Sequence, residues 1–191
     1  MLPYIVIPVR PFDQGKSRMA SSLSVAERVA LNQRFFTHVL SIACRTLPPS
    51  QCLVVSRSAV VLDQANAVGA LAIAETYHNL NAALSQASDI AESLGVGRIL
   101  ALSTDLPLLT QSELVEMFTI KADVVIAPDA GDMGTNALLL ARPGLIPYRY
   151  GKDSFSAHCA SAEAAGLKVS IFKRPGLAHD MDTPADLQFM H

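Results

Sequence analysis

The sequence predicts an α/β fold in which a mainly parallel sheet is covered by helices on both faces. Two observations predict it. Short apolar runs rich in Val, Ile and Leu recur along the chain, and most of the segments between them have helical length and apolar residues at helical spacing. Strands that are buried on both faces read as continuous apolar runs, because neither face meets water.

The expected strands follow one another along the chain as YIVIPV, CLVVS, ALAIAE, RILALS, DVVIAP, TNALLLAR and KVSIFK. Helix-length segments separate most of the first five. After Pro128 the regular alternation ends, because two apolar runs follow with only one helix, over residues 154 to 165, between them. We therefore expect a sheet that is parallel in its first part and mixed in its last part.

Capping residues mark the starts of three helices. Ser24 with Glu27, and Thr110 with Glu113, fit the capping box, in which the two side chains satisfy free backbone N–H groups reciprocally. Thr183 followed by Pro184 fits an N-cap with proline at the first helical position. These signals predict helices that begin just after residues 24, 110 and 183.

Composition narrows the class of protein. Half of the 191 residues are hydrophobic, so residues 1–191 are expected to form a single domain with its own core. Fifteen Lys and Arg against seventeen Asp and Glu give a net charge of -2, which supplies no broad basic face for nucleic acid. No run reaches the roughly 20 apolar residues of a membrane span. We expect a soluble cytoplasmic protein that binds neither nucleic acid nor membrane.

The first strand runs into an unusual loop, IPVRPFDQGKSRM, over residues 7–19. In an open α/β sheet, ligands bind outside the carboxyl ends of the strands, where this loop must lie. Arg10, Lys16 and Arg18, with backbone N–H groups made approachable at Gly15, would suit a polyphosphate. The loop is not a Walker A motif, because the second glycine and the Gly-Lys-Ser/Thr entry into a helix are missing. A solvated loop whose cations happen to cluster is the alternative.

Three carboxylates are candidate metal ligands. Asp105 follows an apolar strand in STDLPLL, and Asp180 and Asp182 alternate in AHDMDTPADL just before a predicted helix. Asp105 and Asp182 together offer two hard oxygen ligands, and Mg²⁺ is typically held by one or two carboxylates with waters and substrate phosphates. Each aspartate could instead be a turn or helix-entry residue.

Six segments in this order resemble the 2-phospho-L-lactate guanylyltransferase family of deazaflavin-coenzyme biosynthesis, whose relatives include the molybdenum-cofactor guanylyltransferases. They cover nearly the whole chain: IPVRPFDQGKSRM, LNAAL at 80–84, STDLPLL at 103–109, APDAGDMGTNALLL at 127–140, YGKDSFSAH at 150–158 and DMDTPADL at 180–187. The resemblance implies a Rossmann-like nucleotidyltransferase fold with a mostly parallel, mixed sheet. It also implies transfer of GMP from GTP to 2-phospho-L-lactate, phosphoenolpyruvate or 3-phospho-D-glycerate, with release of pyrophosphate.

The same resemblance implies roles for individual residues. Lys16, Arg18 and Asp105 would be catalytic. The nucleotide would be bound by Pro8, Val9, Lys16, Ser17, Arg18, Glu75 and Asn81, with guanine and ribose near the last two. The acceptor's phosphate and carboxylate would be held by Thr135, Asn136, Gly151 and Ser154. Mg²⁺ would be bound by Asp105 and Asp182, with Asp180 as a further candidate. His158 ends the last part of the YGKDSFSAH segment, and no role is assigned to it.

The chemistry agrees with this interpretation. A phosphate monoester has a second pKa near 6, so at neutral pH the acceptor is largely a dianion and needs no general base. Its approach to a triphosphate is opposed by charge repulsion, and a divalent ion with Lys and Arg relieves that repulsion. An arrangement of Ser, His and Asp for nucleophilic catalysis is therefore not expected.

Departures from the family pattern leave alternatives open. Asp13 and Gln14 stand where small apolar residues are common, and Arg10 stands where lysine is more usual. A nucleotidyltransferase for another phosphorylated acceptor is one alternative, although the glycine-rich GGxSxRMG loop of those relatives is absent. A non-catalytic nucleotide-binding module is another, although the three carboxylates are present. A homodimer, or association with the next enzyme of the pathway, is also conceivable.

Overall fold

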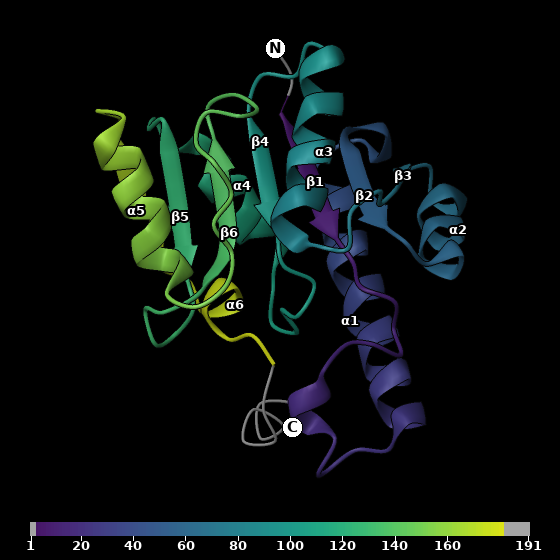
Figure 1. Cartoon of the computed structure of the whole chain (residues 1–191). Coiled ribbons are helices and arrows are strands. Elements are labelled where there is room, and N and C mark those ends of the chain that lie inside the picture. The colour runs from purple at the N-terminus through teal and green to yellow at the C-terminus, as the bar shows by residue number, and fades with distance from the viewer. Residues whose placement is uncertain (1–2, 182–191) are drawn as a thin grey trace.

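The computed structural model describes residues 3–181, which form a seven-stranded sheet in the order β3-β2-β1-β4-β6-β5-β7 (Figure 1). All seven predicted strands are present. Their bounds are Tyr4–Pro8 for β1, Cys52–Ser56 for β2, Leu71–Ala74 for β3, Ile99–Leu102 for β4, Val124–Pro128 for β5, Thr135–Leu140 for β6 and Val169–Ile171 for β7. The predicted α/β fold class is confirmed.

The sheet is mixed, as the loss of alternation after Pro128 predicted. Strands β1 to β4 run parallel, β6 lies antiparallel between β4 and β5, and β7 runs parallel to β5. Only residues 129–134 join β5 to β6, and so short a connection allows antiparallel but not parallel pairing. The Asp129 carboxylate shapes this loop by accepting the N–H groups of Met133 at 2.8 Å and Gly134 at 2.7 Å.

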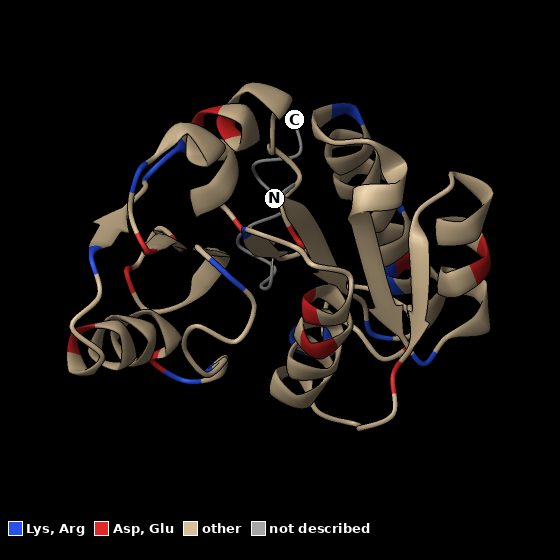
Figure 2. Ribbon diagram, turned by 90° about the horizontal axis from the view of Figure 1, so that it is seen from above, with Lys and Arg blue, Asp and Glu red and all other residues tan. Residues whose placement is uncertain are grey.

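Helices cover both faces of the sheet (Figures 1 and 2). One apolar core joins alternate strand residues such as Ile5 and Ile7 to α1, α2, α4 and α6, and the other joins residues such as Val6 to α3 and α5. The helices are Val25–Thr46 (α1), Ala59–Ala67 (α2), Leu80–Ser93 (α3), Gln111–Thr119 (α4), Ser154–Ala164 (α5) and Pro175–Ala178 (α6), with short 3₁₀ turns at Ser17–Met19 (η1) and Pro49–Gln51 (η2). Because strand side chains alternate between faces, the central strands β1, β2, β4, β5 and β6 contribute to both cores.

Both predicted capping boxes are present. Ser24 and Glu27 satisfy each other's backbone N–H groups at the start of α1, and Thr110 and Glu113 do so at the start of α4. Thr183, the third predicted cap, lies outside the described residues. Ser154 is the first residue of α5, while Asp153 is its N-cap, in left-handed conformation with a φ of 55°.

Lys and Arg are interspersed with Asp and Glu along the described part of the chain (Figure 2). This distribution agrees with the net charge of -2, and the expectation that the protein does not bind nucleic acid stays a prediction. Within residues 3–181, no helix combines the length and the apolar character that crossing a bilayer demands.

Glu113 also connects α4 to α6, and this contact yields a stability prediction. Its second carboxylate oxygen accepts the Gly176 N–H at 2.8 Å. A Cβ on Gly176 would overlap the Glu113 carboxylate and lie 2.5 Å from the Leu108 carbonyl oxygen. We therefore expect Gly176→Ala to lower the free energy of unfolding by about 1–3 kcal/mol, measured in urea. Gly131→Ala is the control, because its Cβ would make ordinary contacts from 3.7 Å; equal losses in both variants would contradict the prediction.

Candidate functional site

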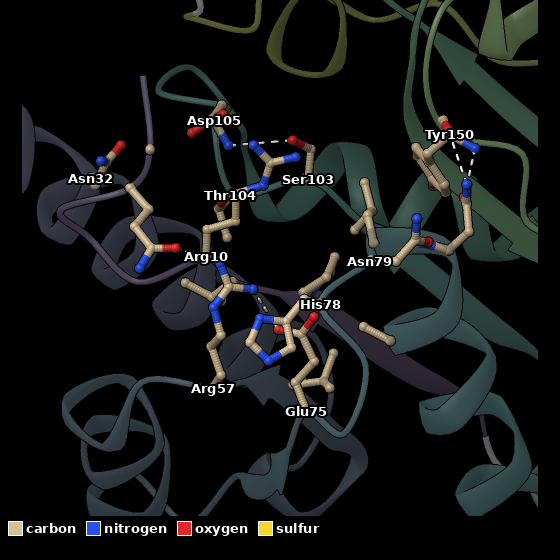
Figure 3. A pocket seen from close by; sticks show the side chains of 18 of the residues that line it. Arg10, Asn32, Arg57, Glu75, His78, Asn79, Ser103, Thr104, Asp105 and Tyr150 are labelled. Atoms are coloured by element: carbon tan, nitrogen blue, oxygen red, sulfur yellow. Dashed lines mark hydrogen bonds and ion pairs between the residues drawn. The ribbon is translucent and has the colours of Figure 1, made fainter. Parts of the chain in front are cut away.

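A cavity of about 570 Å³ opens at the carboxyl ends of β1, β2 and β4 (Figure 3). β1 lies between β2 and β4. The connection from β1 to β2 runs through α1 on one face of the sheet, and the connection from β3 to β4 runs through α3 on the other face. Such a switch point creates a crevice between the loops that follow the strands, and ligands of α/β proteins bind there. The opening loop lies at this crevice, where the sequence predicted it.

Lys16 is the most constrained residue of the opening loop. Its backbone is left-handed with a φ of 55°, a conformation rare for residues other than glycine. Its side chain is only 1% exposed, and Nζ lies 2.9 Å from the Asp105 Oδ1. Nζ also donates to the Met181 carbonyl and lies 5.3 Å above the Phe35 ring. The ammonium group therefore stands inside the cavity wall beside a carboxylate.

Helix α1 holds the opening loop in place. Asn32 Nδ2 donates to the Phe12 carbonyl at 2.7 Å, and the Arg28 guanidinium donates to the Gly15 carbonyl at 3.3 Å. A Cβ on Gly15 would lie 2.5 Å from Asn32 Nδ2, so glycine allows this close approach of loop and helix. Asn32 was not predicted as a site residue, although it lines the cavity.

Asp105 extends from the loop after β4 into the cavity and is 30% exposed. Its N–H donates to Ser103 Oγ at 3.4 Å, and its carbonyl accepts the Met181 N–H at 3.0 Å. The segment that carries the predicted tail aspartates is thus hydrogen-bonded to Asp105. Asp180 is half-buried in that segment, and Asp182 lies outside the described residues. Within residues 3–181 no three His, Cys, Asp or Glu side chains gather in a way that could hold a metal.

A second polar group lies at the other end of the cavity (Figure 3). The Glu75 carboxylate is 8% exposed and lies 3.5 Å from the Arg57 guanidinium, which also donates to the Gln14 side chain. Glu75 was predicted, whereas Arg57 and Gln14 were not. Arg57 directly follows β2, so the rule that ligands bind beyond strand ends would have found it.

Asn81, near the start of α3, acts as a clamp on the chain that leads to α5. Its Nδ2 donates to the Tyr150 carbonyl at 3.0 Å, and its Oδ1 accepts the Tyr150 N–H at 2.7 Å. Both ends of the amide are thereby used by backbone. The clamp holds Gly151, which has a φ of 138° and lines the cavity, against the start of α3.

Thr135, at the start of β6, lines the same end of the cavity and contacts His158. His158 is fully buried, and its Nδ1 lies 3.0 Å from Thr135 Oγ1. Its Nε2 accepts the Arg149 N–H at 3.0 Å. Because a backbone N–H can only donate, Nε2 carries no proton and Nδ1 carries the ring proton. Burial, assisted by the Arg149 charge, lowers the pKa of His158 to about 4 and keeps the ring neutral.

This pKa predicts acid sensitivity. Between about pH 4 and pH 6.5 the unfolded chain binds a proton at His158 that the folded chain does not, so stability falls as pH falls through this range. The loss should approach about 3 kcal/mol. Urea unfolding of wild type and His158→Gln at several pH values tests this, since the advantage of wild type should shrink with acidification. An advantage independent of pH would contradict it.

The cavity brings together eight of the predicted site residues: Pro8, Val9, Lys16, Glu75, Asn81, Asp105, Thr135 and Gly151. Five others lie outside its lining, and Asp182 lies outside the described residues. Ser17 and Arg18 are exposed on η1, and Ser154, the first residue of α5, is only 2% exposed. Asn136 is buried and donates to the Leu177 carbonyl at 2.9 Å, which indicates a structural contact to α6. Asp180 is half-buried and also lies outside the cavity lining.

Comparisons with known proteins find relatives along nearly the whole chain. The family described as guanylyl transferase CofC like matches residues 3–191. A phosphoenolpyruvate guanylyltransferase of Rubrobacter xylanophilus is 35% identical, with 98% of this chain and 92% of the relative covered. A 3-phospho-D-glycerate guanylyltransferase of Colwellia psychrerythraea is 34% identical, covering 97% and 90%. A 2-phospho-L-lactate guanylyltransferase of Methanothermobacter thermautotrophicus is 34% identical, covering 95% and 81%.

A solved structure supports the fold. The nucleotide-diphospho-sugar transferase structure from Desulfovibrio desulfuricans has a TM-score of 0.77 and 16% identity, and the match covers 100% of this chain and 87% of the other. At that identity the likeness concerns the fold alone. It confirms the predicted nucleotidyltransferase architecture.

Proposed function

Because the chain belongs to the guanylyl transferase CofC like family, we propose that it transfers GMP from GTP to a phosphorylated three-carbon acid and releases pyrophosphate. The carrying observation is that one cavity brings together Lys16, Asp105, Glu75 and Thr135 from four separate segments. These residues supply the groups that suit this reaction. A cation would bind the phosphates, one carboxylate would bind a metal, a recessed carboxylate would recognise the guanine base, and a hydroxyl would bind the acceptor.

Glu75 would recognise guanine. A carboxylate is an acceptor only, and the guanine edge offers two N–H donors side by side, whereas adenine has no donor at its N1. Glu75 is held by its own N–H, which donates to the Ser56 carbonyl at 2.9 Å, and by the Arg57 guanidinium. This fixed orientation would favour GTP over ATP, because with ATP the carboxylate would lose hydrogen bonds that water had supplied and would gain none from N1 of the base.

Lys16 and Arg10 would bind the triphosphate. Arg10 is exposed at the cavity, and Lys16 is held beside Asp105. Phosphate oxygens would take over part of the hydrogen bonding of the Lys16 ammonium, so that its charge acts on the phosphates in a site partly screened from water. The backbone of Lys16 is left-handed, and its side chain is buried rather than exposed to solvent.

The residues present fit a divalent ion. Asp105 offers a partly exposed carboxylate, and its backbone is bonded to Met181, which directly precedes Asp182 in the sequence. We propose Mg²⁺ held by Asp105 with Asp182 or Asp180, the remaining ligands being phosphate oxygens and water. When bound, the ion supplies charge neutralisation to the phosphates. Thr135 and Gly151 would orient the acceptor, which attacks as a dianion.

Pyrophosphate release tests the proposal. We expect release from GTP only when both Mg²⁺ and one of the three acids are present. Phosphoenolpyruvate is the first acid to test, because the relative from Rubrobacter xylanophilus is named for it. ATP in place of GTP should give little release. Strict dependence on a sugar phosphate would instead favour another acceptor class, and GTP binding without release in any mixture would favour a non-catalytic binding module.

A further inference from the structure

A buried stripe of residues on α5 lies beside Thr135. We call the end of the cavity that Thr135 and Gly151 line the acceptor end. The buried residues of this helix are Ser154, His158 and Ala162, which are spaced four apart and therefore lie on one face. The stripe is polar at the end nearest the cavity and apolar farther along. Polar side chains are rarely buried without a partner, so the two polar members of the stripe need an explanation.

His158 links the two walls of the acceptor end. Its Nδ1 bonds Thr135 on β6, and its Nε2 bonds the Arg149 backbone in the segment that Asn81 also clamps. The Tyr150 ring, 5.0 Å away with an interplanar angle of 70°, packs against the imidazole in an edge arrangement. One ring therefore determines the position of Thr135 relative to residues 149–151.

The direction of these bonds determines what Thr135 can do. Since the Arg149 N–H requires a bare Nε2, the ring proton lies on Nδ1 and is donated to Thr135 Oγ1. A hydroxyl that accepts from the ring keeps its own hydrogen for another acceptor. With the opposite tautomer, the Thr135 hydroxyl would have to donate to Nδ1 and would have no hydrogen for a ligand.

We propose that His158 is a positioning residue that directs the Thr135 hydroxyl hydrogen into the cavity, where it is donated to an anionic group of the acceptor. This inference rests on the proposed function, because it assumes that the acceptor binds at Thr135. His158 itself is fully buried and touches no substrate. Its effect passes through Thr135, and it should therefore act on acceptor binding and not on GTP binding.

Matched variants separate this role from simple packing. His158→Gln can still accept near the Nε2 position but lacks the donor at Nδ1, whereas His158→Asn retains a donor near Nδ1. Thr135→Val removes the hydroxyl with little change in shape, and Thr135→Ser retains it. The KM for the acceptor and the KM for GTP are measured by pyrophosphate release for each variant and for the double variant Thr135→Val with His158→Gln.

We expect His158→Gln and Thr135→Val each to raise the acceptor KM about tenfold, the effect of one lost hydrogen bond to a charged group, with the GTP KM nearly unchanged. His158→Asn and Thr135→Ser should recover most of the loss. The double variant should be no worse than Thr135→Val, because both changes remove one interaction. The inference would be overturned if the two increases in acceptor KM multiplied in the double variant, or if His158→Gln left the acceptor KM unchanged.

The ring itself provides a readout independent of turnover. The ¹⁵N shifts of His158 in the wild-type protein should show a protonated Nδ1 and a bare Nε2, and Thr135→Val should move the Nδ1 signal. A proton on Nε2 would overturn the inference even if His158→Gln fails to fold. Wild-type protein without turnover for any acid would overturn the proposed function and the acceptor role with it, whereas normal turnover with an unaffected acceptor KM would overturn the positioning role alone.

Discussion

Asp105→Asn is expected to reduce turnover at least about 100-fold, the size of effect seen when one group that stabilises developing charge is removed. Asparagine keeps the size and one oxygen of the side chain but not the charge. The loss should therefore come from weaker metal binding and from a missing counterion for Lys16, whose ammonium lies 2.9 Å from the carboxylate. Turnover is measured by pyrophosphate release at saturating GTP and acceptor.

Two controls make that result interpretable. Asp63→Asn, on the exposed side of α2, removes the same charge away from the cavity and should leave turnover intact. Circular dichroism and thermal unfolding of Asp105→Asn should show a folded protein, because Lys16 also donates to the Met181 carbonyl. If excess Mg²⁺ partly restores Asp105→Asn, the defect is in metal affinity. Full activity of this variant at limiting Mg²⁺ would remove Asp105 from the metal site.

Lys16→Ala is expected to weaken GTP binding by at least about tenfold, because charge-assisted hydrogen bonds to phosphate are among the stronger polar contacts. Lys16→Met is the better-matched variant, since its unbranched side chain retains the packing against Phe35 without the charge. Calorimetric titration with GTP measures the affinity directly. Lys152→Ala, an exposed lysine outside the cavity lining, is the control.

The two lysine variants also separate two explanations. If Lys16 mainly supports the loop, Lys16→Met should bind GTP nearly as well as wild type, and only Lys16→Ala should be weakened. If the ammonium contacts the triphosphate, both variants should lose similar affinity, and the loss should shrink at high salt because charge interactions are screened. Wild-type affinity in both variants would contradict the role proposed for the opening loop.

Much of the architecture was predictable from local patterns. Apolar runs identified all seven strands. The runs are most nearly continuous in central strands such as β1, β2, β4 and β5, because strands covered on both faces hold few polar residues. Ser24 with Glu27 and Thr110 with Glu113 identified two helix starts, because a capping box is satisfied within four residues. The strand-end rule led to Lys16 and Asp105, which the fold brings into contact.

Long-range contacts account for what local patterns missed. Arg57 and Gln14 are 43 residues apart in the chain, and Asn81 and Tyr150 are 69 apart, so their hydrogen bonds have no local signature. The same holds for His158, whose partner Thr135 is 23 residues earlier. The resemblance to a family implied that Asn81 contacts the nucleotide; the structure shows its amide bonded to backbone, so contact with a ribose stays a prediction.

The sequence by itself determined which segments become strands and helices and which charged residues follow the strands, because those properties depend on neighbours a few positions away. Only the tertiary structure decided that β6 is inserted between β4 and β5, that Lys16 turns inward to Asp105, and that the buried imidazole of His158 lies within hydrogen-bond distance of Thr135. Each of these features depends on packing between segments far apart in the chain. Buried polar groups need hydrogen-bond or ion-pair partners, and only the folded chain brings those partners together.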